Sequence, residues 1–89
     1  MPEAGFRIAG RVQGVGFRWW TLGVARDLNL DGWVRNAPDG SVEVAARGPQ
    51  AKLSELRLRL SQGPPAARVE SVREVELSGC IGQGFQIAG

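Results

Sequence analysis

The sequence predicts an α+β fold in which a four-stranded antiparallel sheet carries two helices on one face. Three features of the 89 residues lead to this class. Short segments alternate apolar and polar residues, two other segments repeat apolar residues at helical spacing, and glycine or proline separates the segments. Their order along the chain is strand, helix, strand, strand, helix, strand.

The first strand and the first helix occupy the N-terminal third of the chain. Apolar and polar residues alternate over residues 6–12, which predicts a strand with one buried face. Trp20, Val24 and Leu28 then recur at helical spacing, and we expect a helix over residues 17–29. The glycines between these two segments indicate a tight strand-to-helix turn.

A hairpin and a second helix follow. Residues 33–35 begin a second strand, Pro38-Asp39-Gly40 forms a turn, and residues 41–47 alternate in a third strand. Leucines at helical spacing over residues 53–60 predict the second helix, which ends at Gly63-Pro64-Pro65.

The last long strand spans residues 69–77. Its alternation is imperfect because Val72 has the wrong parity, so we expect a bulge there. Phe85 and Ile87 form a short final segment at the sheet edge. Two strand-helix-strand halves with right-handed crossovers make a ferredoxin-like βαββαβ sandwich, and we expect residues 1–89 to form one domain.

The composition excludes several kinds of site. The chain has no histidine, which rules out histidine acid–base catalysis and the usual zinc ligand sets, and its one cysteine, Cys80, cannot form an internal disulfide. The formal net charge of +2 permits an acidic ligand without requiring one. Residues 1–4 show no signal-peptide pattern and no apolar segment reaches membrane-spanning length, so we expect a cytoplasmic protein.

The segment Gln13-Gly14-Val15-Gly16-Phe17-Arg18, here named the glycine loop, stands where the first strand becomes the first helix. Backbone N–H groups in such a turn form a concave anion site, and glycine allows the positive φ angles that the turn needs. Arg18 adds a guanidinium that matches phosphate oxygens. Neither the dinucleotide-binding nor the P-loop fingerprint is present, so the alternative, a tight turn with a solvated arginine, stays open.

Two motifs resemble the signature of the acylphosphatase family. The first is residues 8–18, IAGRVQGVGFR, and the second is residues 32–36, GWVRN, which is followed by Gly40, Val42 and Gly48 at the family's spacing. The resemblance extends over nearly the whole chain, and the segment Phe85-Gln86-Ile87 near the end of the chain also fits the family. It implies the ferredoxin-like fold and the hydrolysis of acyl phosphates to a carboxylate and inorganic phosphate.

The same resemblance implies the roles of the site residues. Arg18 binds the phosphate, and the backbone amides of Gly14 to Arg18 form the cradle within a phosphate-binding loop made of Gln13, Gly14, Val15, Gly16, Phe17 and Arg18. Asn36 positions the attacking water; its other interpretation is a turn residue that caps the hairpin. We expect no metal and no cofactor, because a carboxylate leaves without protonation and phosphoryl transfer needs mainly alignment and charge stabilisation.

The expected partners are a small acyl phosphate as substrate and inorganic phosphate as product and competing ligand. We expect no nucleic acid, no membrane partner and a monomer. The rival to the enzyme is an acylphosphatase-like module that binds phosphate or carbamoyl phosphate without useful turnover. RNA binding is disfavoured because residues 41–47 have no aromatic side chain that could stack on a base.

Other large side chains have structural interpretations. We expect Trp20 and Trp33 in the core and Trp19 partly buried. Three arginines of the strands are expected to be solvated: Arg11, Arg35 and Arg47.

Overall fold

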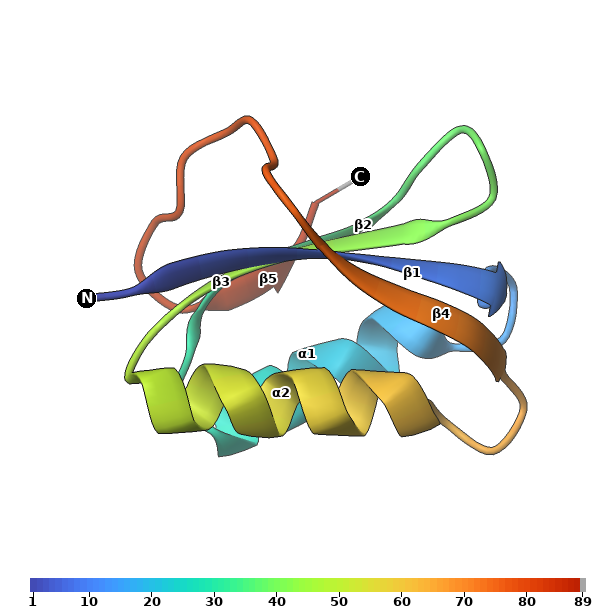
Figure 1. The fold of residues 1–89 in the computed structure, drawn as a ribbon, viewed down its shortest axis with the longest axis horizontal. Helices are drawn as coiled ribbons and strands as arrows, with labels where there is room; N and C mark the ends of the chain where they lie inside the picture. Colours follow the sequence, from blue (N-terminus) through green and yellow to red (C-terminus); the bar gives the residue numbers. More distant parts are fainter. Residues whose placement is uncertain (89) are drawn as a thin grey trace.

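The computed structural model describes residues 1–88. Two helices cover one face of a five-stranded sheet and so form a second layer (Figure 1). In chain order the elements are β1 (Glu3–Arg11), α1 (Phe17–Asp27), β2 (Asp31–Asn36), β3 (Val42–Arg47), α2 (Gln50–Gln62), β4 (Arg68–Val75) and β5 (Phe85–Ile87). The predicted α+β sandwich and its element order are confirmed.

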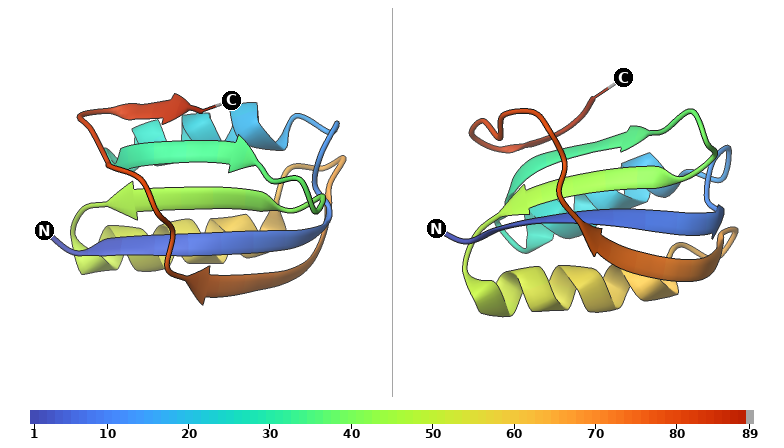
Figure 2. Two further views of the ribbon diagram at one scale, coloured as in Figure 1. Left: turned by 90° about the horizontal axis from the view of Figure 1, so that it is seen from above. Right: turned by 45° about the horizontal axis from the view of Figure 1, so that its top comes forward.

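The sheet differs from the prediction because it has five strands rather than four. Its order is β4-β1-β3-β2-β5, and neighbouring strands are antiparallel except β2 and β5, which are parallel. The edge segment predicted around Phe85 pairs with residues 32–34 and extends the sheet. Residues 76–84 cross the face that the helices leave uncovered (Figure 2). The chain therefore enters β5 beside the start of β2, which makes these two strands parallel.

A bulge in β4 explains its irregular sequence pattern. Ala9 of β1 pairs with Ser71 and Gly10 pairs with Val69, so Glu70 has no partner in the ladder. The extra residue lets Val69 and Val72 both pack against the core although their spacing is odd. The predicted bulge is confirmed, two residues before the expected position.

At Gly10, beside this bulge, the backbone of β1 lies very close to the backbone of β4. Its φ angle is 128°, and a Cβ atom there would lie 2.1 Å from the carbonyl oxygen of Arg68. No other residue fits such a contact without moving β4. The end of β1 and the start of the glycine loop are therefore closely packed against β4.

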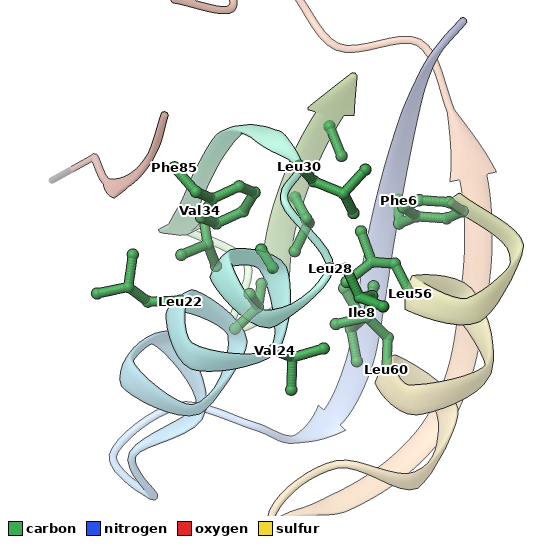
Figure 3. Close-up of a cluster of buried hydrophobic side chains, with 14 of the residues drawn as sticks. Phe6, Ile8, Leu22, Val24, Leu28, Leu30, Val34, Leu56, Leu60 and Phe85 are labelled. Carbon is green, nitrogen blue, oxygen red and sulfur yellow. The ribbon is translucent and has the colours of Figure 1, made fainter. Parts of the chain in front are cut away.

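The core lies between the sheet and the helices (Figure 3). Phe6 and Ile8 of β1 and Val34 of β2 are at most 1% exposed. Leu56 and Leu60 of α2 belong to the same buried cluster. Burial of each of these side chains contributes about 1.5–3 kcal/mol, and together they fix both helices on the sheet.

The uncovered face of the sheet holds an ionic network beside the apolar ring of Trp33. The buried carboxylate of Glu43 accepts hydrogen bonds from Arg7 and Arg35, each at 2.9 Å. The Arg7 hydrogen bond is the largest of the effects that lower the pKa of Glu43. The guanidinium of Arg35 also lies 4.4 Å from the ring centroid of Trp33. The expectation that Arg35 is simply solvated is therefore wrong.

Residues 76–84, here named the arm, are held on the same face by hydrogen bonds. Arg47 donates to the carbonyl oxygens of Ile81 and Gly82 and forms an ion pair with Asp31. Arg47 is thus a structural arginine rather than a solvated one. Trp33 is buried as predicted, but it lies outside the main core cluster and near Gly79 of the arm.

We expect Glu43→Gln to destabilise the protein in a pH-dependent way. Because the folded-state pKa of Glu43 is lowered, its contribution is present above the ordinary value of 4.5 and is lost as the pH falls through the folded-state pKa. At pH 7 the substitution should lower the free energy of unfolding by roughly 1–2 kcal/mol. Urea denaturation of both proteins at pH 7 and at a pH below the folded-state pKa measures this difference, which should shrink strongly at the lower pH. An equal difference at both pH values would contradict the ion-pair account.

Candidate active site

The glycine loop and the tip of the β2–β3 hairpin lie at the same end of the sheet (Figure 1). The hairpin tip is residues 37–41. The glycine loop is anchored at both ends, because Val12 and Phe17 are each 1% exposed and belong to the core. Residues 13–16 between these anchors are all at least partly exposed. The exposed segment is thus held in place by the buried residues on either side.

The φ angles of the glycine loop follow the alternation that is typical of an anion nest. Gly14 and Gly16 have φ angles of 75° and 78°, while Val15 between them does not have a positive φ. An alternation of this kind turns successive N–H groups toward one side of the chain. A Cβ atom on Gly14 or Gly16 would meet nothing within 4 Å. The glycines are therefore needed for their φ angles, and the space above them is open.

The N-terminus of α1 is uncapped. Gly16 is its N-cap residue, no side chain caps the first turn by a hydrogen bond, and no acidic residue lies in that turn. The first N–H groups of a helix need a partner from a side chain, water or a ligand. The positive end of the helix dipole favours an anion at the same place.

Arg18 is the second residue of α1 and is partly exposed. A cation in the first turn is unfavourable beside the helix dipole unless an anion lies close to it. Its position therefore fits the phosphate-binding role that the sequence predicts.

Asn36 ends β2, where it pairs with Val42 of β3. It has the same parity as Val34, so its side chain faces the helix layer. Its Oδ1 atom is buried and has no hydrogen-bond partner among the described residues. A buried acceptor without a partner is rare in folded proteins. This oxygen is available for the hydrogen of a bound water.

Asp39 caps the hairpin turn, which was the alternative role considered for Asn36. Asp39 Oδ1 accepts hydrogen bonds from the backbone N–H of Ser41 at 2.9 Å and from its hydroxyl at 2.6 Å. The Ser41 hydroxyl is the main cause that lowers the pKa of Asp39. The Asp-Gly-Ser spacing is an Asx-turn signal that could have identified this cap from the sequence.

Gln13 has a role that the sequence did not indicate. Its Nε2 atom donates to the carbonyl oxygens of Ala37 at 2.8 Å and Ser41 at 2.9 Å. The side chain of Gln13, which was predicted only as the first residue of the phosphate-binding loop, therefore contacts the hairpin tip.

Two residues of α1, Trp19 and Thr21, differ from expectation or were missed. Trp19 is 71% exposed, so its predicted partial burial is wrong, whereas Trp20 packs on Phe17 with ring centroids 5.4 Å apart. Thr21 lies one helical turn after Arg18 and is fully buried, and its hydroxyl also has no partner among the described residues. No pattern in the sequence distinguishes this threonine from an ordinary core residue.

Two further observations concern residues 1–88. Within this part of the chain, no three His, Cys, Asp or Glu side chains are close enough together to hold a metal ion. Neither helix that the structure describes is both long and apolar enough to cross a membrane.

We expect Gly16→Ala to destabilise the protein by about 1–2 kcal/mol, because an L-residue is strained at its left-handed φ angle. Gly16→Asn should cost less, since asparagine tolerates that conformation. Gly23 is the matched control: it lies inside α1, has no positive φ, and its Cβ would also meet nothing within 4 Å. Gly23→Ala should stabilise the protein by about 0.5–1 kcal/mol. Thermal and urea unfolding distinguish these outcomes, and stabilisation by both alanines would contradict the assigned backbone geometry.

Comparison with known proteins identifies relatives of this chain. A family model described as Acylphosphatase matches residues 4–87. An acylphosphatase from Rhizorhabdus wittichii is 49% identical over 88% of this chain and 79% of its own length. The crystal structure of acylphosphatase from Bacillus subtilis aligns over 100% of both chains, with a TM-score of 0.91 and 34% identity. Full-length HypF in a phosphate- and nucleotide-bound form matches 99% of this chain but only 12% of its own, with a TM-score of 0.73 and 28% identity.

Proposed function

The chain belongs to the acylphosphatase family, and from this premise we propose that the glycine loop, Arg18 and Asn36 form its active site. Acylphosphatases hydrolyse the carboxyl–phosphate bond of acyl phosphates, and this is the activity of the chain. Water attacks phosphorus, the bond between phosphorus and the carboxylate oxygen breaks, and a carboxylate and inorganic phosphate are released. The substrate is a small molecule, and phosphate also binds as a competing ligand.

The observation that carries the assignment is the buried, unpartnered Oδ1 atom of Asn36. Leaving such an acceptor unsatisfied costs about 1–3 kcal/mol. A water that donates to this oxygen removes that cost and is held with a lone pair free for attack. Because an amide does not titrate, Asn36 orients the water rather than deprotonating it. The proton of the water passes to the phosphate of the substrate itself.

The phosphate half of the substrate is bound by main-chain N–H groups and by Arg18. Three observations support this part of the proposal: the alternating φ signs at Gly14 and Gly16, the uncapped N-terminus of α1, and the absence of an acid from its first turn. These fixed donors stabilise the charge that develops on the equatorial oxygens in the transition state. The leaving group is a weak base and needs no general acid. We therefore infer that hydrolysis requires no metal ion.

The binding module without turnover is the less favoured alternative. Arg18 and Asn36 are both present, and the alignment with the Bacillus subtilis acylphosphatase covers the full length of both chains. A cytoplasmic location, a monomeric state and the absence of nucleic-acid and membrane partners stay predictions that accompany the proposal.

We expect the purified protein to hydrolyse a simple aromatic acyl phosphate at neutral pH in the presence of EDTA, because Arg18 and the backbone supply the charge stabilisation. Release of phosphate, measured with and without the chelator, tests this. The rate should be the same in both conditions. A folded protein that binds phosphate without turning over the acyl phosphate would instead support the binding module.

Arg18 and Asn36 should have separable kinetic effects. Asn36→Ala should lower kcat by about 100-fold or more, while the inhibition constant of phosphate changes less than about 3-fold, since Asn36 acts on the water. Arg18→Ala should weaken phosphate binding and lower kcat together. Arg18→Lys is the control that keeps the charge but loses the planar fork, and it should recover part of the binding. Loss of phosphate binding in Asn36→Ala with an unchanged kcat would reverse these roles.

A further inference from the structure

The side chain of Gln13 connects the two motifs of the site directly. A glutamine amide nitrogen has two hydrogens to donate. In this structure Nε2 uses both on carbonyl oxygens, those of Ala37 and Ser41. Because carbonyl oxygens accept and never donate, only the amino group of Gln13 can face this pair. The bonds join positions 24 and 28 residues apart in the chain.

The two carbonyls that Gln13 binds form the base of the hairpin tip. The N–H of Ala37 donates to the oxygen of Ser41 at 2.8 Å, and the N–H of Gly40 donates to the oxygen of Ala37 at 3.1 Å. The Asp39 carboxylate holds the other side of the turn through Ser41. Gln13 therefore binds a compact, internally bonded unit rather than a loose loop.

Ala37 is bonded covalently to Asn36, so this unit determines where the end of β2 lies. On its strand side Asn36 is held by pairing with Val42. After Asn36 the chain leaves the sheet, and the two hydrogen bonds of the Gln13 side chain connect this part of the chain to the glycine loop. Gln13 itself follows the buried Val12 and precedes Gly14, where the proposed cradle begins.

We propose that Gln13 is a positioning residue that fixes the separation between the phosphate cradle and the water on Asn36. The inference rests on the proposed function. In-line attack needs the water and the phosphorus in a narrow range of geometry, and a displacement of about 1 Å can cost about 100-fold in rate. Gln13 contributes through the position of Asn36 and does not contact the substrate with its side chain.

The test replaces Gln13 by methionine, which has a similar length but no donor. Gln13→Met should lower kcat by about 10- to 100-fold and change the phosphate inhibition constant by less than about 3-fold. Gln13→Glu should lower kcat at least as much, because its carboxylate would face two carbonyl oxygens. Gln62→Met is the matched control, since Gln62 is exposed at the end of α2, and its kinetics should equal those of the unmodified protein.

A double-mutant cycle separates positioning through Asn36 from a general structural effect. In the Asn36→Ala background, Gln13→Met should lower kcat by less than about 2-fold, because the residue that it positions is gone. Full additivity, or a rise in the phosphate constant that matches the fall in kcat, would overturn the proposal. An unchanged kcat in Gln13→Met would also overturn it.

Amide hydrogen exchange tests the contact between Gln13 and the hairpin tip without a measurement of turnover. Gln13→Met should increase the exchange rate of the Ala37 N–H by about 10-fold or more relative to Gln62→Met, because its acceptor carbonyl is less firmly held. If this happens and no variant hydrolyses substrate, the proposed function fails but the contact between loop and hairpin stands. If the Ala37 exchange rate is unchanged, the proposal fails whatever the activity.

Discussion

The exposed part of the glycine loop, residues 13–16, depends on the burial of the side chains on either side of it. Val12 and Phe17 are each 1% exposed, and only residues 13–16 connect them. Within this span the chain must leave a strand and start a helix, which brings left-handed φ angles at Gly14 and Gly16. The helix then begins without a side-chain cap. Core packing and backbone geometry thus produce the arrangement that we propose as an anion site, and Arg18 contributes its guanidinium to it.

The position of Asn36 depends on its strand, β2, which lies inside the sheet and not at an edge. Because β5 pairs with the first half of β2, the strand that carries Asn36 has neighbours on both sides. An unpartnered buried oxygen persists only where the surrounding structure determines its position. The contact of Gln13 with the hairpin tip then connects this strand to the glycine loop. The proposed chemistry needs little more than this, since alignment and charge stabilisation dominate phosphoryl transfer.

The sequence predicted features whose physical cause is local. The order of the elements, the bulge of β4 and the edge segment at Phe85 follow from the periodicity of apolar residues. The parallel pairing of β5 was missed because it results from the crossing of residues 76–84 over the uncovered face, which no local pattern records. The Gln13 contacts were missed for the same reason, since a side chain that binds carbonyls 24 and 28 residues away leaves no periodic signal. The exposure of Trp19 was missed as well.

Titration of the ¹⁵N-labelled protein with inorganic phosphate tests the central claim most directly, because backbone amide shifts report where an anion binds. We predict that the largest shift changes fall on the amides of residues 14–18, with smaller changes at Asn36 and the hairpin tip. The arginine-rich uncovered face, with Arg7, Arg11 and Arg35, offers the competing location for an anion. Shift changes confined to that face, with the amides of residues 14–18 unaffected at saturation, would contradict the account.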